Sequence, residues 1–244
     1  MESAHPSPAA IAELAPDGRL RAAINFGNPV LANRTPGTGE PGGISTDIAR
    51  ELARRLGVPL EFVPYEQAGN VVEGLKAAAW DVCFLAIDPL RATDIAFTNP
   101  YVVIEGVYMV AIDSPVQGNE DVDRAGTRVG VIVGSAYDLF LSRELKQATI
   151  VRAVDAPAVM DLWVAGKLDA VGGVKPQLEA DAKRTGGLRL LPRRFMAINQ
   201  AMGTPRSRET GARYLRAFIE DVKATGFIAE AFARNRIEGA SLAP

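Results

Sequence analysis

Apolar residues along the chain fall into two patterns, short continuous runs and stripes at helical spacing. Continuous runs bounded by Gly, Pro or Asp are typical of strands buried in a parallel sheet. We predict such strands over residues 20–25, 60–63, 82–87, 102–112, 128–133, 150–153 and 170–174. Apolar residues three or four positions apart predict helices, which we place over residues 45–56, 71–78, 135–146, 156–165, 212–222 and 228–232.

The order of these elements repeats along the chain. A βαβαβ unit precedes residue 102 and a second one follows the expected loop over 113–126, which predicts two α/β lobes. Each copy contains a similar phrase, Lys76-Ala-Ala-Ala-Trp-Asp-Val and Val164-Ala-Gly-Lys-Leu-Asp-Ala. Any α/β unit can make this turn, so the phrase by itself favours ordinary turn chemistry over a true repeat.

Individual boundaries follow from Gly, Pro and capping residues. The first helix is predicted to use Ser45 or Thr46 as its N-cap and to stop at Gly57. The Gly- and Pro-rich stretch over 27–43 is predicted to be a loop. Asp81 and Asp169 are expected at the N-terminal ends of their strands.

A polar group follows the apolar run over 82–87, where Asp88 and Arg91 come directly after the predicted strand. Ligands of open α/β sheets bind at the C-terminal ends of the strands, and a guanidinium matches a carboxylate with two parallel hydrogen bonds. Arg91 is therefore a candidate for binding a small anion. An ordinary surface arginine explains this segment equally well.

The second βα repeat contains a candidate of the same kind at Gly134-Ser-Ala-Tyr137. A strand that ends at Gly134, followed by a helix that begins at Ser135, directs backbone N–H groups and a hydroxyl to the sheet edge. Ser135 is also a good helix cap, which is the commoner role of such a residue. Glu105, inside a long apolar strand, is expected to have a partner or to face a cleft.

Composition restricts the function further. The chain of 244 residues is 48% hydrophobic and 23% charged, with a net charge of −2 and scattered basic residues, which disfavours nucleic acid and anionic membranes as partners. One cysteine, Cys83, and one histidine, His5, leave no disulfide, no expected metal site or cofactor, and no Ser-His or Cys-His dyad.

Targeting signals are not recognised in the sequence. No apolar segment approaches the roughly 20 residues that span a bilayer. The N-terminal stretch lacks a basic start and an apolar core, so it is not expected to be a secretory signal. The protein is therefore expected either to be cytoplasmic or to have lost a signal peptide.

The motifs together resemble family 3 of the ABC transporter solute-binding proteins, which have the type 2 periplasmic-binding-protein fold. The resemblance extends from Leu20 to about Arg234. It rests on the order and spacing of these motifs: Gly43-Ile-Ser-Thr-Asp-Ile-Ala, Trp80-Asp-Val leading to Arg91, Phe97-Thr-Asn-Pro-Tyr101, Val129-Gly-Val, Gly134-Ser-Ala-Tyr137 and Leu168-Asp-Ala-Val171.

The resemblance implies an α/β fold of two lobes, each a mostly parallel sheet flanked by helices, joined by a two-strand hinge near residues 106–112 and 197–203. Lobe 1 would comprise residues 1–108 and take back 199–244 with the C-terminal helices, and lobe 2 would comprise 109–198. The family's members close around their ligand. A monomer is expected.

The resemblance also implies roles for individual residues. Arg91 matches the arginine that binds the ligand carboxylate, and Ser135 matches the hydroxyl residue that completes this site from lobe 2. Further expected ligand contacts come from strand ends and the first loop: Ala86, Ile87, Asp88, Phe26, Asn28, Tyr65, Gly134, Ala136, Tyr137 and Val174. Of these, Phe26 or Tyr65 is expected to supply an aromatic wall.

One position departs from the family pattern. Where amino acid binders carry an Asp that pairs with the ligand ammonium, this chain has Val174, and a buried unpaired ammonium costs several kcal/mol. Two explanations stay open: the ligand has no ammonium, or Asp88 binds it.

The expected function is to bind a small carboxylate-bearing ligand, an amino acid or related organic acid, for an ABC importer, without catalysis and, if a signal peptide was removed, in the periplasm. Two alternatives are a dehydratase of the cyclohexadienyl dehydratase type on the same fold and a cytosolic small-molecule sensing module. Asp88 or Glu105 would have to supply the acid for the dehydratase.

Overall fold

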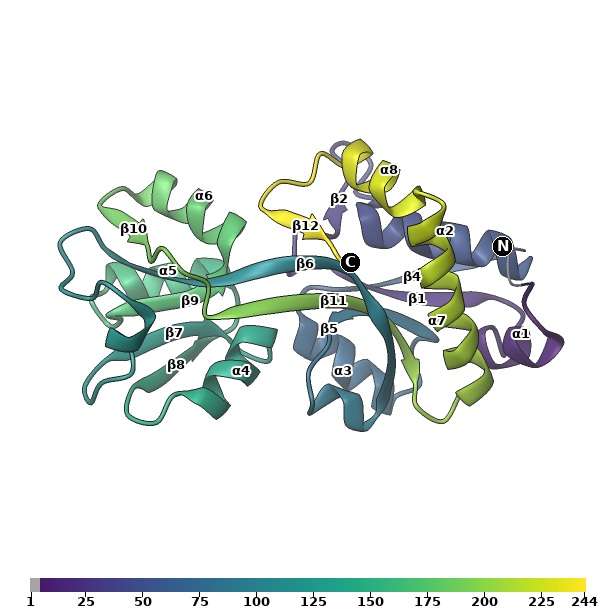
Figure 1. The fold of residues 1–244 in the computed structure, drawn as a ribbon, viewed down its shortest axis with the longest axis horizontal. Helices are drawn as coiled ribbons and strands as arrows, with labels where there is room; N and C mark the ends of the chain where they lie inside the picture. The colour runs from purple at the N-terminus through teal and green to yellow at the C-terminus, as the bar shows by residue number, and fades with distance from the viewer. Residues whose placement is uncertain (1–4) are drawn as a thin grey trace. The chain divides into compact units, whose positions relative to one another are not determined.

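The computed structural model describes residues 5–244, which divide into two compact units (Figure 1). Unit 1 contains the described residues up to Val103 together with Asn199–Pro244, and unit 2 is Ile104–Ile198. Two strands cross the boundaries between the units, β6 (Ile95–Ala111) and β11 (Met196–Pro205). The chain is thus an α/β protein in which a segment inserted into unit 1 forms unit 2.

The sheet of unit 1 is built from three parallel strands and one antiparallel strand. Strands β4 (Leu60–Tyr65), β1 (Leu20–Asn25) and β5 (Val82–Ala86) are parallel in that order, and β11 runs antiparallel beside β5. Every residue of β5 is buried, which explains its continuous apolar sequence. In the sheet, β1 lies between β4 and β5. Helix α2 (Ile44–Leu56) connects β1 to β4 and helix α3 (Ala68–Lys76) connects β4 to β5, in the opposite direction across the sheet. Because both crossovers are right-handed, the two helices cover opposite faces.

The remaining elements of unit 1 come from both ends of the chain. They are α1 (Pro8–Leu14), β2 (Asn33–Arg34), β3 (Pro41–Gly42), η1 (Arg91–Thr93), α7 (Glu209–Ala224), α8 (Phe227–Arg234) and β12 (Ala240–Leu242). The predicted loop over 27–43 contains the two-residue strands β2 and β3, which form a small hairpin. Helix α1 was not predicted from the sequence, and it packs Leu14 against Gly211 at the start of α7.

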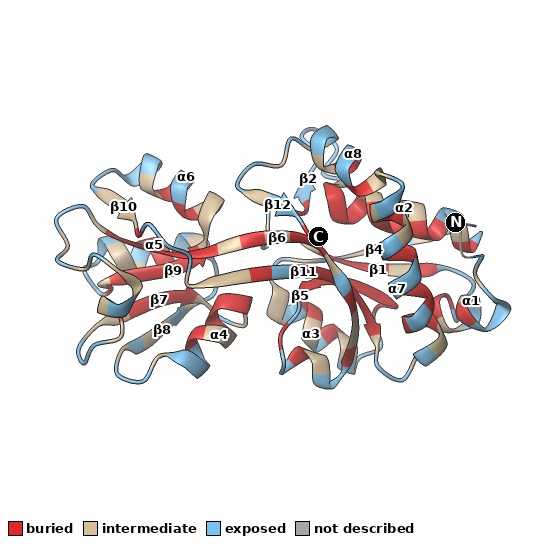
Figure 2. Cartoon of the chain, viewed as in Figure 1, coloured by how far each residue is buried: buried red, intermediate tan, exposed pale blue. Residues whose placement is uncertain are grey.

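Unit 2 repeats the plan of unit 1. Strands β8 (Thr149–Ala153), β7 (Arg128–Ile132) and β9 (Ala170–Val174) are parallel in that order, and β6 is antiparallel to β9. The other elements are η2 (Asn119–Asp121), α4 (Ala136–Glu144), α5 (Ala156–Val164), α6 (Lys175–Thr185) and β10 (Leu188–Leu190), which pairs with β6. In both units the central strands are buried and the helices expose their outer faces (Figure 2).

Each unit contains the same set of hydrogen bonds between an arginine and an aspartate, which we call the Arg–Asp clasp. In unit 1, Arg21 donates from its backbone N–H and its Nε to Asp81 Oδ2 at 2.9 and 3.0 Å, and from Nη2 to Oδ1 at 2.9 Å. In unit 2, Arg128 makes the same three bonds to Asp169, at 2.8, 2.9 and 2.9 Å. In each unit Nη1 also donates to the carbonyl three residues before the aspartate. The phrase shared by the two halves therefore reflects equivalent structure.

The clasps lie at the N-terminal ends of the strands, as predicted for both aspartates. Each joins the first of the three parallel strands of its unit to the third, since Arg21 and Arg128 belong to β1 and β7 and the aspartates precede β5 and β9. Among residues 5–244, no helix is long and apolar enough to cross a membrane. The candidate ligand residues Arg91 and Ser135 follow the opposite, C-terminal ends of the strands.

Candidate functional site

The C-terminal end of β5 forms the candidate site of unit 1. The chain turns sharply after Ala86, and Asp88 holds the turn by accepting a hydrogen bond from the backbone N–H of Leu90 at 2.9 Å. This turn directs Arg91 back toward the strand, where its Nη1 donates to the carbonyl of Ala86 at 3.0 Å. Arg91 and Asp88 are each only 3% exposed. Arg91 is thus a buried arginine, which excludes the ordinary surface arginine that the sequence left open.

The charge of Arg91 is held in an environment of low polarity. Burial lowers the pKa of the Arg91 guanidinium from its ordinary value, and the neighbouring Asp88 carboxylate opposes this shift. An arginine still keeps its proton at physiological pH. The end of β5 therefore presents a fixed cation and its counter-ion, flanked by the partly exposed apolar side chain of Ile87.

The two aromatic candidates of unit 1 have different surroundings. Phe26 follows β1, and the guanidinium of Arg34 lies over its ring at 4.2 Å from the ring centre, a favourable cation–π contact. Tyr65 instead packs with the core cluster around Trp80, and its hydroxyl lies against Gly74 of α3. Both residues are half-buried, and the core contacts of Tyr65 favour Phe26 as the aromatic wall.

Asn28 offers an unused acceptor in the same loop. Its backbone carbonyl accepts hydrogen bonds from Leu31 and Ala32 at 3.0 and 3.1 Å. Its side-chain Oδ1 is buried and has no hydrogen-bond partner among the described residues. Since buried polar atoms are nearly always satisfied, this oxygen is available to a donor from a ligand or from water.

The start of α4 forms the candidate site of unit 2. Gly134 has a φ of +70°, a conformation that favours glycine, and the helix then begins at Ala136 with Ser135 as its N-cap. Ser135 Oγ accepts the backbone N–H of Asp138 at 3.0 Å. Ser135, Ala136 and Tyr137 are all nearly buried. The capping role of Ser135 is confirmed, and its side chain also forms a hydrogen bond with the hydroxyl of Tyr137.

A carboxylate that the sequence analysis overlooked stabilises this helix start. Asp138 Oδ2 accepts the backbone N–H of Gly134 at 2.9 Å, and Oδ1 accepts from Ser142 and from Arg152 Nε at 3.2 and 2.9 Å. An acidic residue three positions after a Ser cap is a recognised helix-start signal, so the sequence could have identified Asp138. Arg152 compensates its charge from the neighbouring strand β8.

The last candidate of unit 2, Val174, ends β9 beside a group of charged residues. Val174 is opposite Gly106 of β6 in the antiparallel register, which places the preceding residue, Glu105, at the same edge of the sheet. Glu105 forms salt bridges with Lys175, at 3.0 Å from Nζ to Oε2, and with Arg194, at 3.8 Å from Nη1 to Oε1. Glu105 thus has the partners expected for an ionisable residue in an apolar strand.

Groups suited to metal or nucleophilic chemistry are not assembled in the described part of the chain. No group of three or more His, Cys, Asp or Glu side chains among residues 5–244 could hold a metal ion. The thiol of Cys83 is fully buried in β5, and burial raises its pKa to about 12, so it is a core residue and not a nucleophile. The arrangement is suited to binding an anion.

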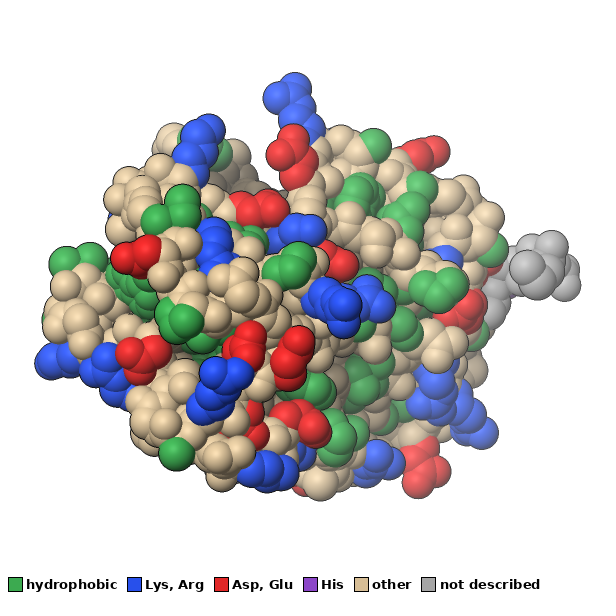
Figure 3. Space-filling model, turned by 60° about the vertical axis from the view of Figure 1, so that its left-hand side comes forward, with side chains coloured by type: hydrophobic (Ala, Val, Ile, Leu, Met, Phe, Trp, Pro, Cys, Tyr) green, Lys and Arg blue, Asp and Glu red, His purple; other side chains and the backbone are tan. Residues whose placement is uncertain are grey.

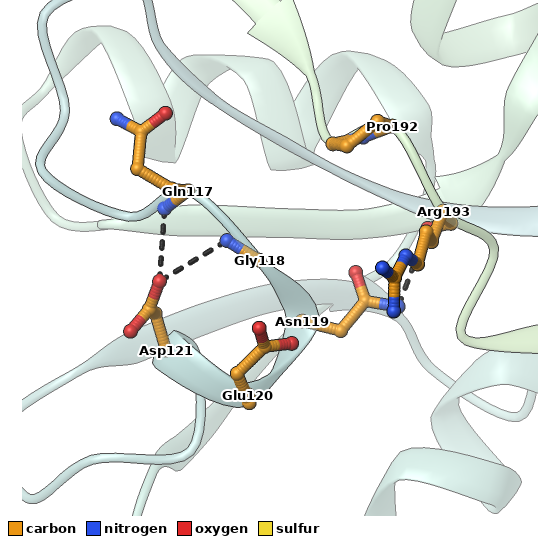
Figure 4. A pocket seen from close by; sticks show the side chains of 7 residues that line it. All are labelled: Gln117, Gly118, Asn119, Glu120, Asp121, Pro192 and Arg193. Carbon is orange, nitrogen blue, oxygen red and sulfur yellow. Dashed lines mark hydrogen bonds between the residues drawn. The ribbon is translucent and has the colours of Figure 1, made fainter.

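A small pocket of about 180 Å³ lies elsewhere in unit 2, between the segment around η2 and the residues after β10 (Figure 4). Its walls are Gln117, Gly118, Asn119, Glu120, Asp121, Pro192 and Arg193. None of the candidate ligand residues lines it.

Acidic and basic side chains are interspersed over the face of the molecule in Figure 3, which carries no extended patch of one sign.

The chain is similar to known proteins in both sequence and fold. Residues 20–235 match the family described as bacterial extracellular solute-binding proteins, family 3. A mutant of ArgBP from T. maritima has a TM-score of 0.78 and 22% identity, covering 94% of this chain and 100% of that chain. A histidine kinase sensor domain with similarity to periplasmic binding proteins has a TM-score of 0.77 and 18% identity, covering 92% and 98%.

A third similar structure is that of the ancestral amino acid-binding protein AncCDT-1, a precursor of cyclohexadienyl dehydratase. It has a TM-score of 0.75 and 20% identity and covers 92% of this chain and 98% of that chain. At such identities these likenesses establish the fold. The type 2 periplasmic-binding-protein fold expected from the sequence is confirmed.

Proposed function

We propose that this chain, which belongs to the bacterial extracellular solute-binding proteins of family 3, binds a small carboxylate-bearing ligand, an amino acid or a related organic acid, and delivers it to an ABC importer. Similar structures include amino acid ABC transporter binding proteins, one of them bound to L-arginine. The permease that would receive the ligand is part of the proposal, as are action outside the cytoplasm and a monomeric state.

The observation that carries the proposal is the buried guanidinium of Arg91. Burying a cation is costly unless it is paired and hydrogen-bonded, and here the carbonyl of Ala86 and the charge of Asp88 support it. A side chain fixed in this way loses little further conformational freedom when it binds a carboxylate. Ser135 of unit 2 is the second proposed carboxylate contact, and one ligand held by both groups would produce the ligand-induced closure that we propose.

An enzymatic alternative has less support. AncCDT-1 is described as a precursor of cyclohexadienyl dehydratase, so the fold is compatible with that reaction. A dehydratase needs an acid that can transfer a proton to the leaving hydroxyl. The two candidates are already engaged, Asp88 in holding its turn and Glu105 in salt bridges. Incubation with prephenate or arogenate, followed by product analysis, distinguishes this alternative, because a binding protein returns both compounds unchanged.

A sensing role is favoured by one observation, the likeness to a histidine kinase sensor domain over 92% of this chain. Sensing and transport both require ligand binding, so the same site would be used. Growth of a deletion strain on the identified ligand separates the two roles. A transport protein is required for uptake at limiting ligand concentration, whereas a sensor alters gene expression and leaves uptake by the constitutively expressed importer intact.

The binding proposal is tested with purified protein. Native mass spectrometry of the protein as purified shows whether a ligand is retained, and isothermal titration calorimetry measures its affinity after removal by denaturation and refolding. Arg91→Met is expected to weaken binding at least ~10-fold, because a hydrogen bond to a charged group contributes ~1.5–3 kcal/mol. Arg216→Met, at an exposed arginine of α7, is the matched control and should bind normally. Binding that is equal in both variants would refute the proposed site.

A further inference from the structure

Unit 2 brings charged residues together where its strands end. Strands β7 and β9 are parallel, so Gly134 after β7 and Val174 at the end of β9 lie at the same edge of the sheet. Strand β6 is antiparallel to β9 and pairs Gly106 with Val174, so Glu105 lies at this edge too. We call Glu105, Lys175 and Arg194 the basic triplet.

The charge of the basic triplet is positive. Lys175 Nζ lies 3.0 Å from Glu105 Oε2, and Arg194 Nη1 lies 3.8 Å from Glu105 Oε1. The backbone N–H of Phe195 donates to the carbonyl of Gly106 at 2.9 Å, which fixes the adjacent Arg194 beside β6. The carboxylate of Glu105 thus pairs with two cations, and the basic triplet has a net charge of +1 next to the apolar end of β9.

The other carboxylates at the strand ends of unit 2 are engaged in holding helices. Asp138 accepts from Gly134, Ser142 and Arg152 at the start of α4. Asp155 follows β8, the outer strand of this unit, and caps α5 by accepting the N–H of Ala158 at 2.8 Å. A ligand ammonium near Val174 would therefore meet the ammonium of Lys175 and compete with it for Glu105.

The carboxylates that follow parallel strands in unit 1 are engaged as well: Glu66 after β4 forms a salt bridge with Arg34, and Asp88 follows β5. Asp88 accepts the N–H of Leu90 at 2.9 Å and provides the negative charge beside the buried Arg91. To bind a ligand ammonium, Asp88 would have to share its charge between two cations. The buried Asn28 Oδ1, which has no hydrogen-bond partner among the described residues, is neutral and accepts from a hydroxyl as readily as from an amine.

From these placements we infer that the ligand is an organic acid without an amino group, and that Lys175 and Arg194 favour it over the corresponding amino acid. This inference rests on the proposed function, because it specifies the ligand of the same carboxylate-binding site. Plain, 2-hydroxy and 2-oxo carboxylic acids meet the requirement. An amino acid would bring a cation to an edge whose carboxylates are already neutralised, and its desolvation would be uncompensated.

The first test identifies the functional groups of the ligand without needing its name. The protein as purified is analysed by native mass spectrometry, the bound molecule is released with acid, and equal portions are treated with an amine-specific and a carboxyl-specific reagent. The inference expects a mass increase with the carboxyl reagent only. A mass increase with the amine reagent overturns the inference and leaves the proposed function standing. A ligand that reacts with neither reagent overturns both.

The second test compares matched compounds by isothermal titration calorimetry: L-leucine with 4-methyl-2-oxopentanoate, L-glutamate with 2-oxoglutarate, and L-phenylalanine with phenylpyruvate. In every pair with measurable binding, the oxo acid should bind at least ~10-fold more tightly than the amino acid, since an unpaired buried charge is costly. Tighter binding of any amino acid than of its oxo acid overturns the inference. If neither the protein as purified nor this panel shows binding, both the inference and the proposed function are refuted.

Variants locate the preference in the basic triplet. Lys175→Met should weaken binding of the preferred acid ~10-fold, while Lys183→Met, at an exposed lysine of the same helix, should leave it unchanged. Val174→Asp should reverse the preference within the pair toward the amino acid. Because Lys175 is 40% exposed, its replacement is compatible with folding. Equal affinities of the Lys175 and Lys183 variants would refute the role of the triplet.

Discussion

The two Arg–Asp clasps provide a matched pair for measuring how burial determines the contribution of an ion pair. The side chain of Asp81 is 0% exposed, whereas that of Asp169 is 42% exposed, although both accept the same three bonds from an arginine. Asp81 accepts one more bond, from Arg208 Nη1 at 2.7 Å, which connects the clasp to the residue before α7. The perturbation is replacement of each aspartate by asparagine.

The expected costs differ because the charges left behind differ in exposure. Asp81→Asn keeps the shape of the side chain but leaves two arginines, each 18% exposed, without their counter-ion. Removing one member of a buried pair costs ~3–5 kcal/mol, and the partial exposure of both arginines places the expected value at the lower end, about 3 kcal/mol. Asp169→Asn breaks a pair that is exposed to water, for which ~0–1 kcal/mol is typical.

The assay is urea unfolding monitored separately in the two units. The chain contains two tryptophans, Trp80 in unit 1 and Trp163 in unit 2. Trp163→Phe therefore leaves Trp80 as the reporter of unit 1, and Trp80→Phe leaves Trp163 as the reporter of unit 2. Separate reporters are necessary because a chain of two units need not unfold in a single step. The free energies of unfolding of each variant are compared with those of the parent carrying the same reporter.

The pH dependence gives an independent check. Burial opposes ionisation of Asp81, but the hydrogen bonds from Arg21 and Arg208 outweigh it, so its folded-state pKa is below the ordinary value of 3.8. A lowered pKa stabilises the fold fully at pH values above the unfolded pKa, and this contribution is lost as the pH falls through the folded value. The difference between parent and Asp81→Asn should therefore be constant near neutrality and decrease below about pH 4. An Asp169→Asn cost equal to or greater than that of Asp81→Asn would show that burial does not determine the contribution of the clasp.

Three further predictions concern other sites. Gly74→Ala should destabilise unit 1 by ~1–3 kcal/mol in urea unfolding, because the new Cβ would clash with the hydroxyl of Tyr65. An additional Tyr65→Phe change should recover part of this loss, and the absence of any recovery would contradict the contact. Cys83 should react with a thiol reagent only after unfolding, since burial raises its pKa to about 12; fast reaction of the folded protein at pH 8 would contradict this. Arg152→Met should lower stability by ~2 kcal/mol by leaving Asp138 partly uncompensated, and the double variant with Asp138→Asn should lose less than the sum of the two changes.

The elements that the sequence predicted correctly are those with an apolar pattern and a clear boundary signal. The run over 82–87 contains the fully buried β5, which ends one residue earlier at Ala86, and Ser135 caps α4 as expected. Gly57 ends α2 in a left-handed conformation with a φ of +69°, as its position after the last apolar residue predicted. These signals are local, and they determine the structure by the conformations and hydrogen bonds of a few neighbouring residues.

The sequence-based predictions were wrong where contacts between residues far apart in the sequence determine the element boundaries. Helix α2 begins at Ile44, with Gly43 as its N-cap, instead of using Ser45 or Thr46. Gly43 has a φ of +106°, and a Cβ there would lie 2.5 Å from the carbonyl of Leu31, so close approach of the preceding loop sets the boundary. Helix α6 was missed because Val174 has no capping side chain.

The same distinction applies to the candidate site. Arg91 could be selected from its place after an apolar strand, but its burial depends on the turn that Asp88 holds and on the carbonyl of Ala86. Glu105 could be recognised as unusual within β6, whereas its partners Lys175 and Arg194 lie 70 and 89 residues away in sequence. Only the pairing of strands β6 and β9 brings them together.

The opposite ends of the strands in each unit show how one βα plan separates stability from binding. At the N-terminal ends, an arginine and an aspartate neutralise each other within the clasp, and neither is left for a ligand. At the C-terminal ends the balance is different: Asp88 compensates the single buried Arg91, and Glu105 is shared by two cations. Around Glu105 an added anion improves the balance of charge, whereas an added cation worsens it. Under the proposed binding role, the residues that distinguish the two ends are the ones that would select the charge of the ligand.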